Sequence, residues 1–466
     1  MKQFYILMIT LLMGLSANAE KTGTCGPHLN WKLTDDGVLT ITGTGQMDNY
    51  DDNLSASPWY YNKNVKQVII ADGVTSIGEY AFIFCTQLTS VSLPNSVTTI
   101  GNEAFNQCKT LTSINIPNSL TTIGNKAFSD CKALTSINLP NSVTTIGDEA
   151  FDGCTALTSI NIPDGVTKIG YRTFMSCTAL TSINIPNSVT TIGIGALSHC
   201  IALTSIDIPN SVTTIGEYAF SGCAALTSIN IPNGVTTIPN QAFYHCYALA
   251  SINIPNGVTT IGNESFCDCG IKSIEIPNSV ITIGNWAFEK CRYLTSINIP
   301  NNVTTIGEEA FSGCRKLKQV DIPNSTTTLR KGLLKDCSSL ESVRIHKDVV
   351  EIEESVFDGC TKLTNILCEA ITPPTCGTNA FRYVDKSNCK VYVPKASIDT
   401  YKVANEWKDF SYIETTGITN NVYNKAELVD VYTIDGTKRL TKASKEEMKG
   451  LPKGVYIVNG KKLVIK

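Results

Sequence analysis

Charged residues are scarce in this chain. They make up 17% of its 466 residues, and the formal net charge is only −3. Binding to nucleic acid or to anionic lipid through phosphate groups needs a broad basic field, which so few charges do not provide. The composition therefore predicts that neither kind of polyanion is a partner.

Histidine is rarer still, with four residues in total. His199 and His245 occupy equivalent positions of a sequence repeat but lie two repeats apart, which corresponds to about 10 Å if the repeats stack like neighbouring strands. That is too far for one proton relay. No serine or cysteine has a recurring general base beside it, and paired acids such as Glu308 and Glu309 are interpreted as solvated surface. The sequence thus indicates a protein that is not an enzyme and needs no cofactor.

Long apolar runs are also lacking, apart from the one near the N-terminus between Phe4 and Leu15. Lys2 precedes this run, and Ala17-Asn18-Ala19 follows it with the small-x-small pattern of a cleavage site. The run is shorter than the ~20 apolar residues that a helix needs to cross a bilayer. We predict that residues 1–19 are a signal peptide, that the mature chain has no transmembrane segment, and that the protein is secreted or attached to the outer surface.

A unit of 23 residues recurs from Val65 onward. The stretch LTSINIPNSLTTIGNKAFSDCKA, which starts at Leu111, returns as LTSINLPNSVTTIGDEAFDGCTA from Leu134. Successive units keep this length except for one of 22 residues, which ends at Cys291. One cysteine marks each unit: Cys85, Cys108, Cys131, Cys154, Cys177, Cys200, Cys223, Cys246, Cys269, Cys291, Cys314, Cys337 and Cys360.

Within one unit the residues predict a short strand, a corner, a second strand and a turn. Ile114 and Ile116 alternate with polar residues, as in a strand with one buried face. Pro117 ends that strand because it has no amide hydrogen to donate. Ile123 belongs to a second extended segment, and Ala127-Phe128 is predicted to start a short helical turn.

No single unit can bury its own apolar side, so the units must stack and share one core. The fold class predicted is a leucine-rich-repeat solenoid, mostly β with short helical turns, built as a curved right-handed stack of 23-residue rungs. A phenylalanine three residues before the cysteine forms its spine, and Leu197 and Leu334 replace it twice: Phe82, Phe105, Phe128, Phe151, Phe174, Phe220, Phe243, Phe266, Phe288, Phe311 and Phe357.

The recurring pattern LxxIxIPxxVTxIGxxAFxxCxx, from Val65 to Asp409, closely resembles the BspA-like leucine-rich repeat family. The resemblance implies that the segment from Cys25 to Asn62 belongs to a β-rich N-terminal cap, predicted over residues 20–64. It also implies that Ile371 to Phe410 is the last repeat, so that the solenoid spans residues 65–413. Such caps are required because terminal rungs would otherwise expose the core to water.

Residues 414–466 differ in composition and are predicted to form a small β domain. Leu428 to Ile434 alternates as a strand, and Asp435-Gly436 and Asn459-Gly460 are hairpin signals. This tail resembles the C-terminal sorting domain of type IX secretion cargo, which implies export to the cell surface. It lacks the Asn-Pro motif often found near the start of such domains, and a structural end-cap is the alternative.

Eighteen cysteines in an exported chain ordinarily suggest a disulfide framework. One cysteine per rung instead predicts side chains that all point the same way into the core, which favours buried thiols over bridges. Outside this column, the first candidate for a bridge is Cys376 with Cys389 or Cys368. Cys267 and Cys269 have no histidine partner nearby, so no metal site is predicted.

Threonine recurs as Val-Thr-Thr-Ile in nearly every unit, which raises the possibility of a regular hydroxyl array like that of ice-binding solenoids. In Val97-Thr98-Thr99-Ile100 only about one threonine per rung can face water, since strand side chains alternate between two faces. The β-propensity of threonine is the simpler interpretation.

The outward position at the end of the first strand is the first candidate binding site. In leucine-rich solenoids this strand usually lines the concave face, and its amides and hydroxyls would form a dense hydrogen-bonding array. The alternative is that these are merely soluble strand-surface residues. The candidate residues are Asn115, Asn138, Asn161, Asn184, Asp207, Asn230, Asn253, Glu275, Asn298, Asp321 and Arg344.

A second candidate site is an aromatic edge, because Tyr244, Tyr247, Trp286 and Tyr293 stand where most units carry small or polar residues. Tyrosine and tryptophan are favoured anchors at interfaces. Packing between rungs is the alternative interpretation.

Members of the BspA-like family are associated with attachment to host extracellular-matrix proteins and to other cells. The resemblance therefore implies an adhesin-like binding protein, which we expect to be a monomer, with an extracellular protein or glycan as partner. Two alternatives stay open at this point: a structural surface spacer without a specific ligand, and a glycan-binding module for nutrient capture.

Overall fold

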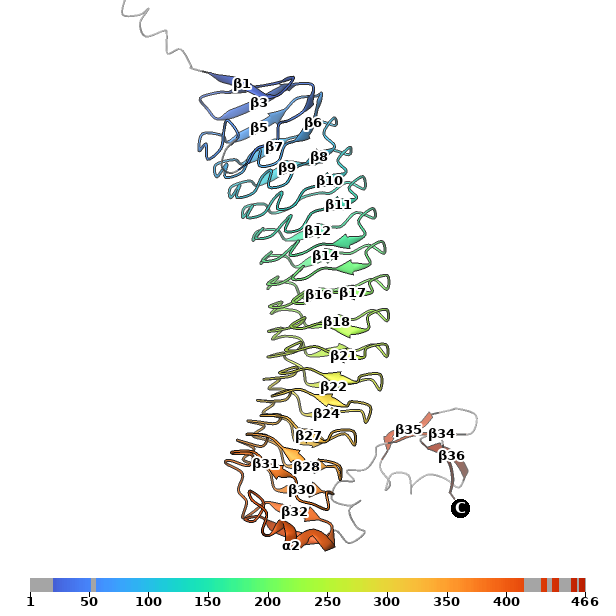
Figure 1. Cartoon of the computed structure of the whole chain (residues 1–466). Helices are drawn as coiled ribbons and strands as arrows, with labels where there is room; N and C mark the ends of the chain where they lie inside the picture. Colours follow the sequence, from blue (N-terminus) through green and yellow to red (C-terminus); the bar gives the residue numbers. More distant parts are fainter. Residues whose placement is uncertain are drawn as a thin grey trace, which may run out of the picture.

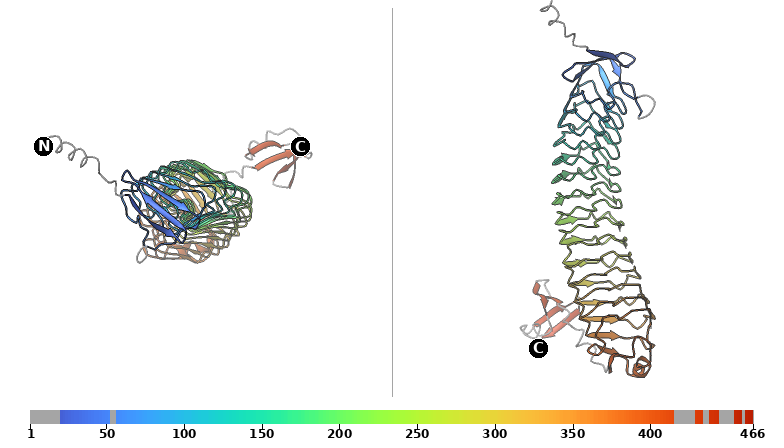
Figure 2. Two further views of the ribbon diagram at one scale, coloured as in Figure 1. Left: turned by 90° about the horizontal axis from the view of Figure 1, so that it is seen from above. Right: turned by 90° about the vertical axis from the view of Figure 1, so that its left-hand side faces the viewer.

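The chain folds into a long, gently curved stack of rungs in a computed structural model (Figure 1). The structure describes residues 20–51 and 56–414, together with the backbone of four strands between residues 429 and 465. Viewed from above, the rungs superpose around one central core (Figure 2). The predicted solenoid fold is confirmed.

First strands of neighbouring rungs pair in parallel, so that Ser159, Ile160 and Asn161 lie opposite Ser182, Ile183 and Asn184. They form several short sheets and not one continuous sheet. At the rung between β9 and β12, an isolated bridge from Ser136 to Ser159 takes the place of a strand. The first strands are β5 (Gln67–Ile70), β7 (Ser90–Ser92), β9 (Ser113–Asn115), β12 (Ser159–Asn161), β14 (Ser182–Asn184), β16 (Ser205–Ile206), β18 (Ser228–Asn230), β20 (Ser251–Asn253), β22 (Ser273–Glu275), β24 (Ser296–Asn298), β26 (Gln319–Asp321), β28 (Ser342–Ile345), β30 (Asn365–Cys368), β32 (Lys390–Val393) and β33 (Ser411–Glu414).

The second strands are shorter and stack in the same register, with Ile123 opposite Ile100 and Ile146. The shortened rung keeps this register, because Thr260 pairs with Thr282 and Ile261 with Ile283. These strands are β6 (Val74–Ile77), β8 (Thr99–Ile100), β10 (Thr122–Ile123), β11 (Thr145–Ile146), β13 (Lys168–Ile169), β15 (Thr191–Ile192), β17 (Thr214–Ile215), β19 (Thr237–Ile238), β21 (Thr260–Ile261), β23 (Thr282–Ile283), β25 (Thr305–Ile306), β27 (Thr328–Leu329), β29 (Glu351–Ile352) and β31 (Thr375–Cys376).

At the N-terminal end, β1 (Lys21–Gly26), β2 (Leu29–Leu33) and β3 (Val38–Gly43) form an antiparallel sheet, and β3 then pairs in parallel with β5. The short β4 (Gly45–Gln46) joins the second-strand sheet through β6. Trp59 is fully buried and stacks on Phe82 at 5.3 Å, while Trp31 meets Trp59 edge-on. These two indoles cover the first phenylalanine of the spine.

At the C-terminal end, the η1 (Lys395–Ser397) and α2 (Ile398–Tyr401) helical turns lie across the last rungs. Trp407 and Phe410 pack against Phe381, each with ring centroids 5.1 Å away. The indole Nε1 of Trp407 donates a hydrogen bond to the carbonyl of Pro374. Aromatic side chains therefore close both ends of the core.

The phenylalanine spine is present as predicted. Its members are fully buried, and successive rings stack with centroids 5.2–5.6 Å apart wherever two phenylalanines are adjacent. Leu197 and Leu334 interrupt the column and are also buried. Offset stacking of aromatic rings adds to the burial of apolar area that holds neighbouring rungs together.

The prediction of a short helical turn starting at Ala127-Phe128 is wrong. Lys126 and Asp130 have φ of 53° and 56°, which a right-handed helix does not allow. The N–H of Ser129 donates to the carbonyl of Lys126 in its own rung, whereas the N–H of Phe128 donates to Ala150 in the next rung. Every second backbone N–H thus donates to the next rung, and those between them donate within their own rung. The segment is therefore a series of tight turns.

The cysteine column consists of buried free thiols, in agreement with the prediction. Each Sγ donates to a carbonyl of the preceding rung at 3.0–3.6 Å, and in most rungs the acceptor is a phenylalanine of the spine, as in Cys131 to Phe105. Burial raises the pKa of the Cys337 thiol to about 12. The bridge considered for Cys376 is not formed, because Cys368, Cys376 and Cys389 are all free thiols.

In the C-terminal tail, β34 (Val429–Thr433), β35 (Lys438–Ala443), β36 (Gly454–Val458) and β37 (Lys461–Ile465) form an antiparallel sheet in the order β35-β34-β36-β37. The strand predicted from Leu428 to Ile434 corresponds to β34. The hairpin dipeptides themselves, and the signal peptide over residues 1–19, lie outside the described residues.

Candidate functional site

The candidate site is the outward surface of the first strands, which we call the ladder face. It comprises two parallel columns, one of serine and one of asparagine or acidic residues, because positions two apart in a strand point to the same side. All the predicted column residues from Asn115 to Asp321 are exposed, whereas Arg344 is half-buried. The matching serine column is exposed as well: Ser113, Ser136, Ser159, Ser182, Ser205, Ser228, Ser251, Ser273 and Ser296.

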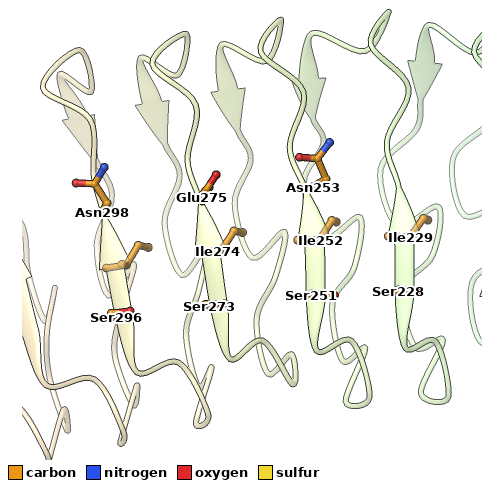
Figure 3. Close-up of a pocket in the computed structure, with 11 residues that line it drawn as sticks. Ser228, Ile229, Ser251, Ile252, Asn253, Ser273, Ile274, Glu275, Ser296 and Asn298 are labelled. Carbon is orange, nitrogen blue, oxygen red and sulfur yellow. The ribbon is translucent and has the colours of Figure 1, made fainter. Parts of the chain in front are cut away.

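Two hollows open on the ladder face. The Glu275 hollow, of about 710 Å³, crosses β18, β20, β22 and β24 (Figure 3). Its polar lining is Ser228, Ser251, Asn253, Ser273, Glu275, Ser296 and Asn298. The Asp207 hollow, of about 450 Å³, includes Asn184, Asp207 and Asn230. The structure thus gathers six of the predicted column residues into two concave surfaces.

The isoleucines between the two columns belong to the buried core, and only their backbone side borders the Glu275 hollow. Ile229, Ile252, Ile274 and Ile297 line it, and each keeps 5–8% of its surface exposed. The phenylalanines of the spine keep none. The floor of the hollow is therefore largely strand backbone, with hydroxyl, amide and carboxylate groups on its two sides.

Some members of the asparagine column are already engaged within the protein. The Asn115 side chain both donates to the carbonyl and accepts from the N–H of Leu93, at 2.9 Å each. The Asn184 amide donates to the Oδ1 of Asn161 at 2.7 Å. No such bond involves the side chains of Asn253, Glu275 or Asn298 in the described part of the chain, which leaves the Glu275 hollow the better equipped for a ligand.

Arg344 is less available than the sequence suggested. Its guanidinium donates to Glu369 Oε1 through Nε at 3.2 Å and through Nη2 at 2.9 Å. Glu369 follows the adjacent strand β30 and lies two positions beyond Leu367, the residue in register with Arg344. The pair therefore joins non-equivalent positions of two rungs, which the repeat pattern alone did not indicate. The ion pair holds two rungs together on the surface.

Two of the four predicted aromatic residues, Tyr244 and Tyr247, are joined through the ring of His245. Tyr244 stacks on His245 with ring centroids 3.8 Å apart, and His245 stacks on Tyr247 at 5.3 Å. Tyr293 lies on another rung, under the Lys316 ammonium at 4.9 Å, and Trp286 is half-buried in a turn. His245, which the sequence analysis treated only as a possible proton carrier, is instead the middle ring of a surface stack.

The threonine columns have a structural role that β-propensity alone does not explain. Thr112 Oγ1 donates to the carbonyl of Thr89 at 3.0 Å, and Thr121 Oγ1 donates to Thr98 at 3.1 Å. Such bonds recur along the stack and join successive rungs. These hydroxyl protons are therefore already used by the protein, which weakens the case for an ice-binding array.

Over the ranges that the structure describes, no group of three or more histidine, cysteine or acidic side chains is arranged to hold a metal ion. No helix within the same ranges has the length and hydropathy needed to cross a bilayer.

Comparison with known proteins places the fold in a family. A family model described as the BspA type leucine rich repeat region matches residues 55–181, 167–295 and 282–406. No curated protein matches the sequence. Among solved structures, a leucine-rich repeat protein from Bacteroides ovatus is 28% identical over 84% of this chain and 99% of its own, with a TM-score of 0.57.

Two further solved structures are similar. A leucine-rich repeat protein from Eubacterium ventriosum is 30% identical, covering 73% of this chain and 95% of its own, with a TM-score of 0.53. A leucine rich cell surface protein from Faecalibacterium prausnitzii is also 30% identical. The match covers 76% of this chain and 96% of its own, with a TM-score of 0.49. From the repeated rungs and the family model that matches most of its length, the chain belongs to the BspA type leucine-rich repeat family.

Proposed function

We propose that this protein is a non-enzymatic, extracellular binding protein of the adhesin type, and that it engages its ligand through the ladder face. The observation that carries the proposal is the pair of exposed columns, each with one residue per rung. They run from rung to rung across the first strands and line two hollows. Repeat proteins commonly use such extended surfaces for binding. An exposed surface of uncharged amides and hydroxyls has the donors and acceptors for many contacts to one large ligand.

Export is part of the same proposal. The apolar run and small-residue pattern before Glu20 fit a signal peptide, which would deliver the chain out of the cytoplasm. The C-terminal strands fit a sorting domain for attachment at the outer surface. The protein would then act as a monomer, displaying its whole length to ligands outside the cell.

The proposal predicts that binding weakens when the acidic residues that interrupt the asparagine column are replaced by uncharged amides. We would screen the protein against extracellular-matrix proteins and glycans, beside a variant carrying Asp207→Asn, Glu275→Gln and Asp321→Asn. Because hydrogen bonds to ionised acceptors are about twice as strong as neutral ones, we expect affinity for the specific ligand to fall about tenfold. Arg344 is left unchanged so that its ion pair with Glu369 is kept.

The matched control removes the same charge elsewhere, through Asp72→Asn, Glu308→Gln and Glu351→Gln on turns and on the second strand. This control should bind like the unaltered protein. Equal weakening by both variants would mean that net charge matters and the ladder face does not. Absence of any ligand on either array would favour the surface spacer.

A further inference from the structure

We propose that the ligand of the ladder face is a linear, uncharged polysaccharide that lies along the solenoid axis. The inference rests on the proposed function and names the class of ligand that the same surface takes. It follows from the shape of the Glu275 hollow, from the regular spacing of its side chains, and from their chemistry.

The shape is that of a trough between two walls. Within each strand the serine and the asparagine or acidic residue are two positions apart, so the columns are separated by about 6.6 Å. Ser273 and Glu275 form one such pair, and the backbone of Ile274, whose side chain belongs to the core, lies between them. The trough crosses successive strands and therefore runs along the axis of the stack. A single extended polymer chain matches this shape better than the broad surface of a folded protein.

The spacing is set by the register of the strands. Ser228 pairs with Ser251 and Asn230 with Asn253, and Ser273 pairs with Ser296. Equivalent groups consequently recur about every 4.8 Å within each of these two sheets, and the trough continues from β20 to β22, which belong to separate sheets. An extended β-1,4-linked pyranose chain advances by one sugar in nearly the same distance. Each rung can then meet one sugar. Because successive sugars of such a chain are turned by about half a turn, equivalent sugar groups meet equivalent side chains on every second rung.

The chemistry of the trough is polar and nearly neutral. Serine hydroxyls and asparagine amides both donate and accept hydrogen bonds, as sugar hydroxyls do. Glu275 is the one charged group in the lining, and its carboxylate can accept bonds from two hydroxyls of one sugar. A charged polymer would find no row of complementary charges here.

A periodic site for a periodic ligand has a measurable signature, which is dependence on ligand length. We would measure binding of the full protein to cello-, manno- and chito-oligosaccharides from two to ten sugars by calorimetry. Each added sugar should occupy another rung, so affinity should rise at least about tenfold, or about 1.4 kcal/mol, between disaccharide and hexasaccharide. Malto-oligosaccharides of the same length, which coil and do not keep the rung spacing, should bind more weakly.

Two matched variants of one rung test whether the oligosaccharide binds in the trough of the ladder face. Ser296→Tyr should fill the trough and reduce hexasaccharide binding at least about tenfold. Thr305→Tyr, at an exposed position of the second strand in the same rung, should have no effect. Circular dichroism checks that both variants keep the fold.

Equal affinity for short and long oligosaccharides would overturn the inference, as would equal loss of binding in both variants. A specific protein ligand on the arrays, sensitive to the acidic ladder variant but without any oligosaccharide binding, would also overturn it while leaving the proposed function intact. Absence of binding to either class of ligand would overturn both.

Discussion

At the scale of single residues, each core cysteine combines two properties. It is small enough to pack beside the phenylalanine spine, and its S–H satisfies a carbonyl of the preceding rung, as Cys154 does for Phe128. Alanine in place of cysteine would leave the carbonyl without this hydrogen bond. A larger apolar residue would not fit in so densely packed a core. This accounts for a reduced thiol at each rung in place of a bridge.

Asp152 gives a residue-scale prediction because its surroundings disfavour the charged form. Partial burial, followed by the nearby carboxylates of Glu149 and Asp130, raises its pKa to about 6. A carboxyl whose pKa is raised on folding contributes stability below its ordinary pKa, and this contribution is lost as pH rises through about 6. Asp152→Asn should therefore stabilise the protein near pH 7.5, by about 1 kcal/mol after allowance for solvent screening.

The measurement is thermal unfolding of both proteins at two pH values. The advantage of the variant should vanish near pH 3.5, where the carboxyl is protonated in both states. Asp72→Asn, on an exposed turn, should show no difference at either pH. A gain for Asp152→Asn that persists unchanged in acid would show that the charge of Asp152 is not its cause.

At the scale of the element, the tight turns after the second strand hold non-glycine residues in the left-handed region. Ser176 has φ of 58°, while the equivalent positions of neighbouring rungs include Gly153 and Gly222. Its N–H donates to the carbonyl of Ser198 at 2.8 Å, so the bond between rungs maintains this conformation. The strain of a side chain there costs roughly 1–2 kcal/mol.

Ser176→Gly should consequently be neutral or stabilising by up to about 1 kcal/mol, because relief of strain exceeds the entropy that glycine loses on folding. The same change in extended backbone, Ser182→Gly of β14, should destabilise by about 0.5–1 kcal/mol. Denaturant unfolding of the two variants measures both. Destabilisation of similar size in both would contradict the role assigned to the left-handed turn.

These turns also mark the limit of what the sequence could predict. The strands, the rung length and the inward positions of Ile114 and Phe128 follow from periodicities within one repeat, and the structure confirms them. The turn around Lys126 depends on hydrogen bonds to the next rung, which patterns within one repeat do not contain. For the candidate site, sequence spacing identified the exposed column. It could not identify the Arg344 pair with Glu369 or the two hollows, since both arise between rungs.

At the scale of the whole molecule, the solenoid is a one-dimensional stack in which each rung contacts its neighbours. Stability is then local, and terminal rungs depend on their caps. Trp59 is the centre of the N-terminal cap. It packs between Trp31 and Phe82, and its indole nitrogen donates to the carbonyl of Ala81.

Trp59→Ala should therefore expose the first rungs without unfolding the rest. Hydrogen exchange should show loss of amide protection in β5 and β7 but unchanged protection in β18, far along the stack. Trp59→Phe, which keeps an aromatic ring over Phe82, should lose much less of this amide protection. Uniform loss across all rungs would indicate that the molecule unfolds as one unit and that the cap has no local effect.

The hydrogen bonds between strands run from rung to rung, along the length of the stack. A pull on the two ends therefore loads the rungs in series, and we expect the rungs to open one at a time because each contacts only its neighbours. Each rung that opens releases 23 residues, or about 80 Å of extended chain. Such a stack would lengthen in steps under tension and re-form when the load falls, which would make the adhesin proposed above an extensible tether.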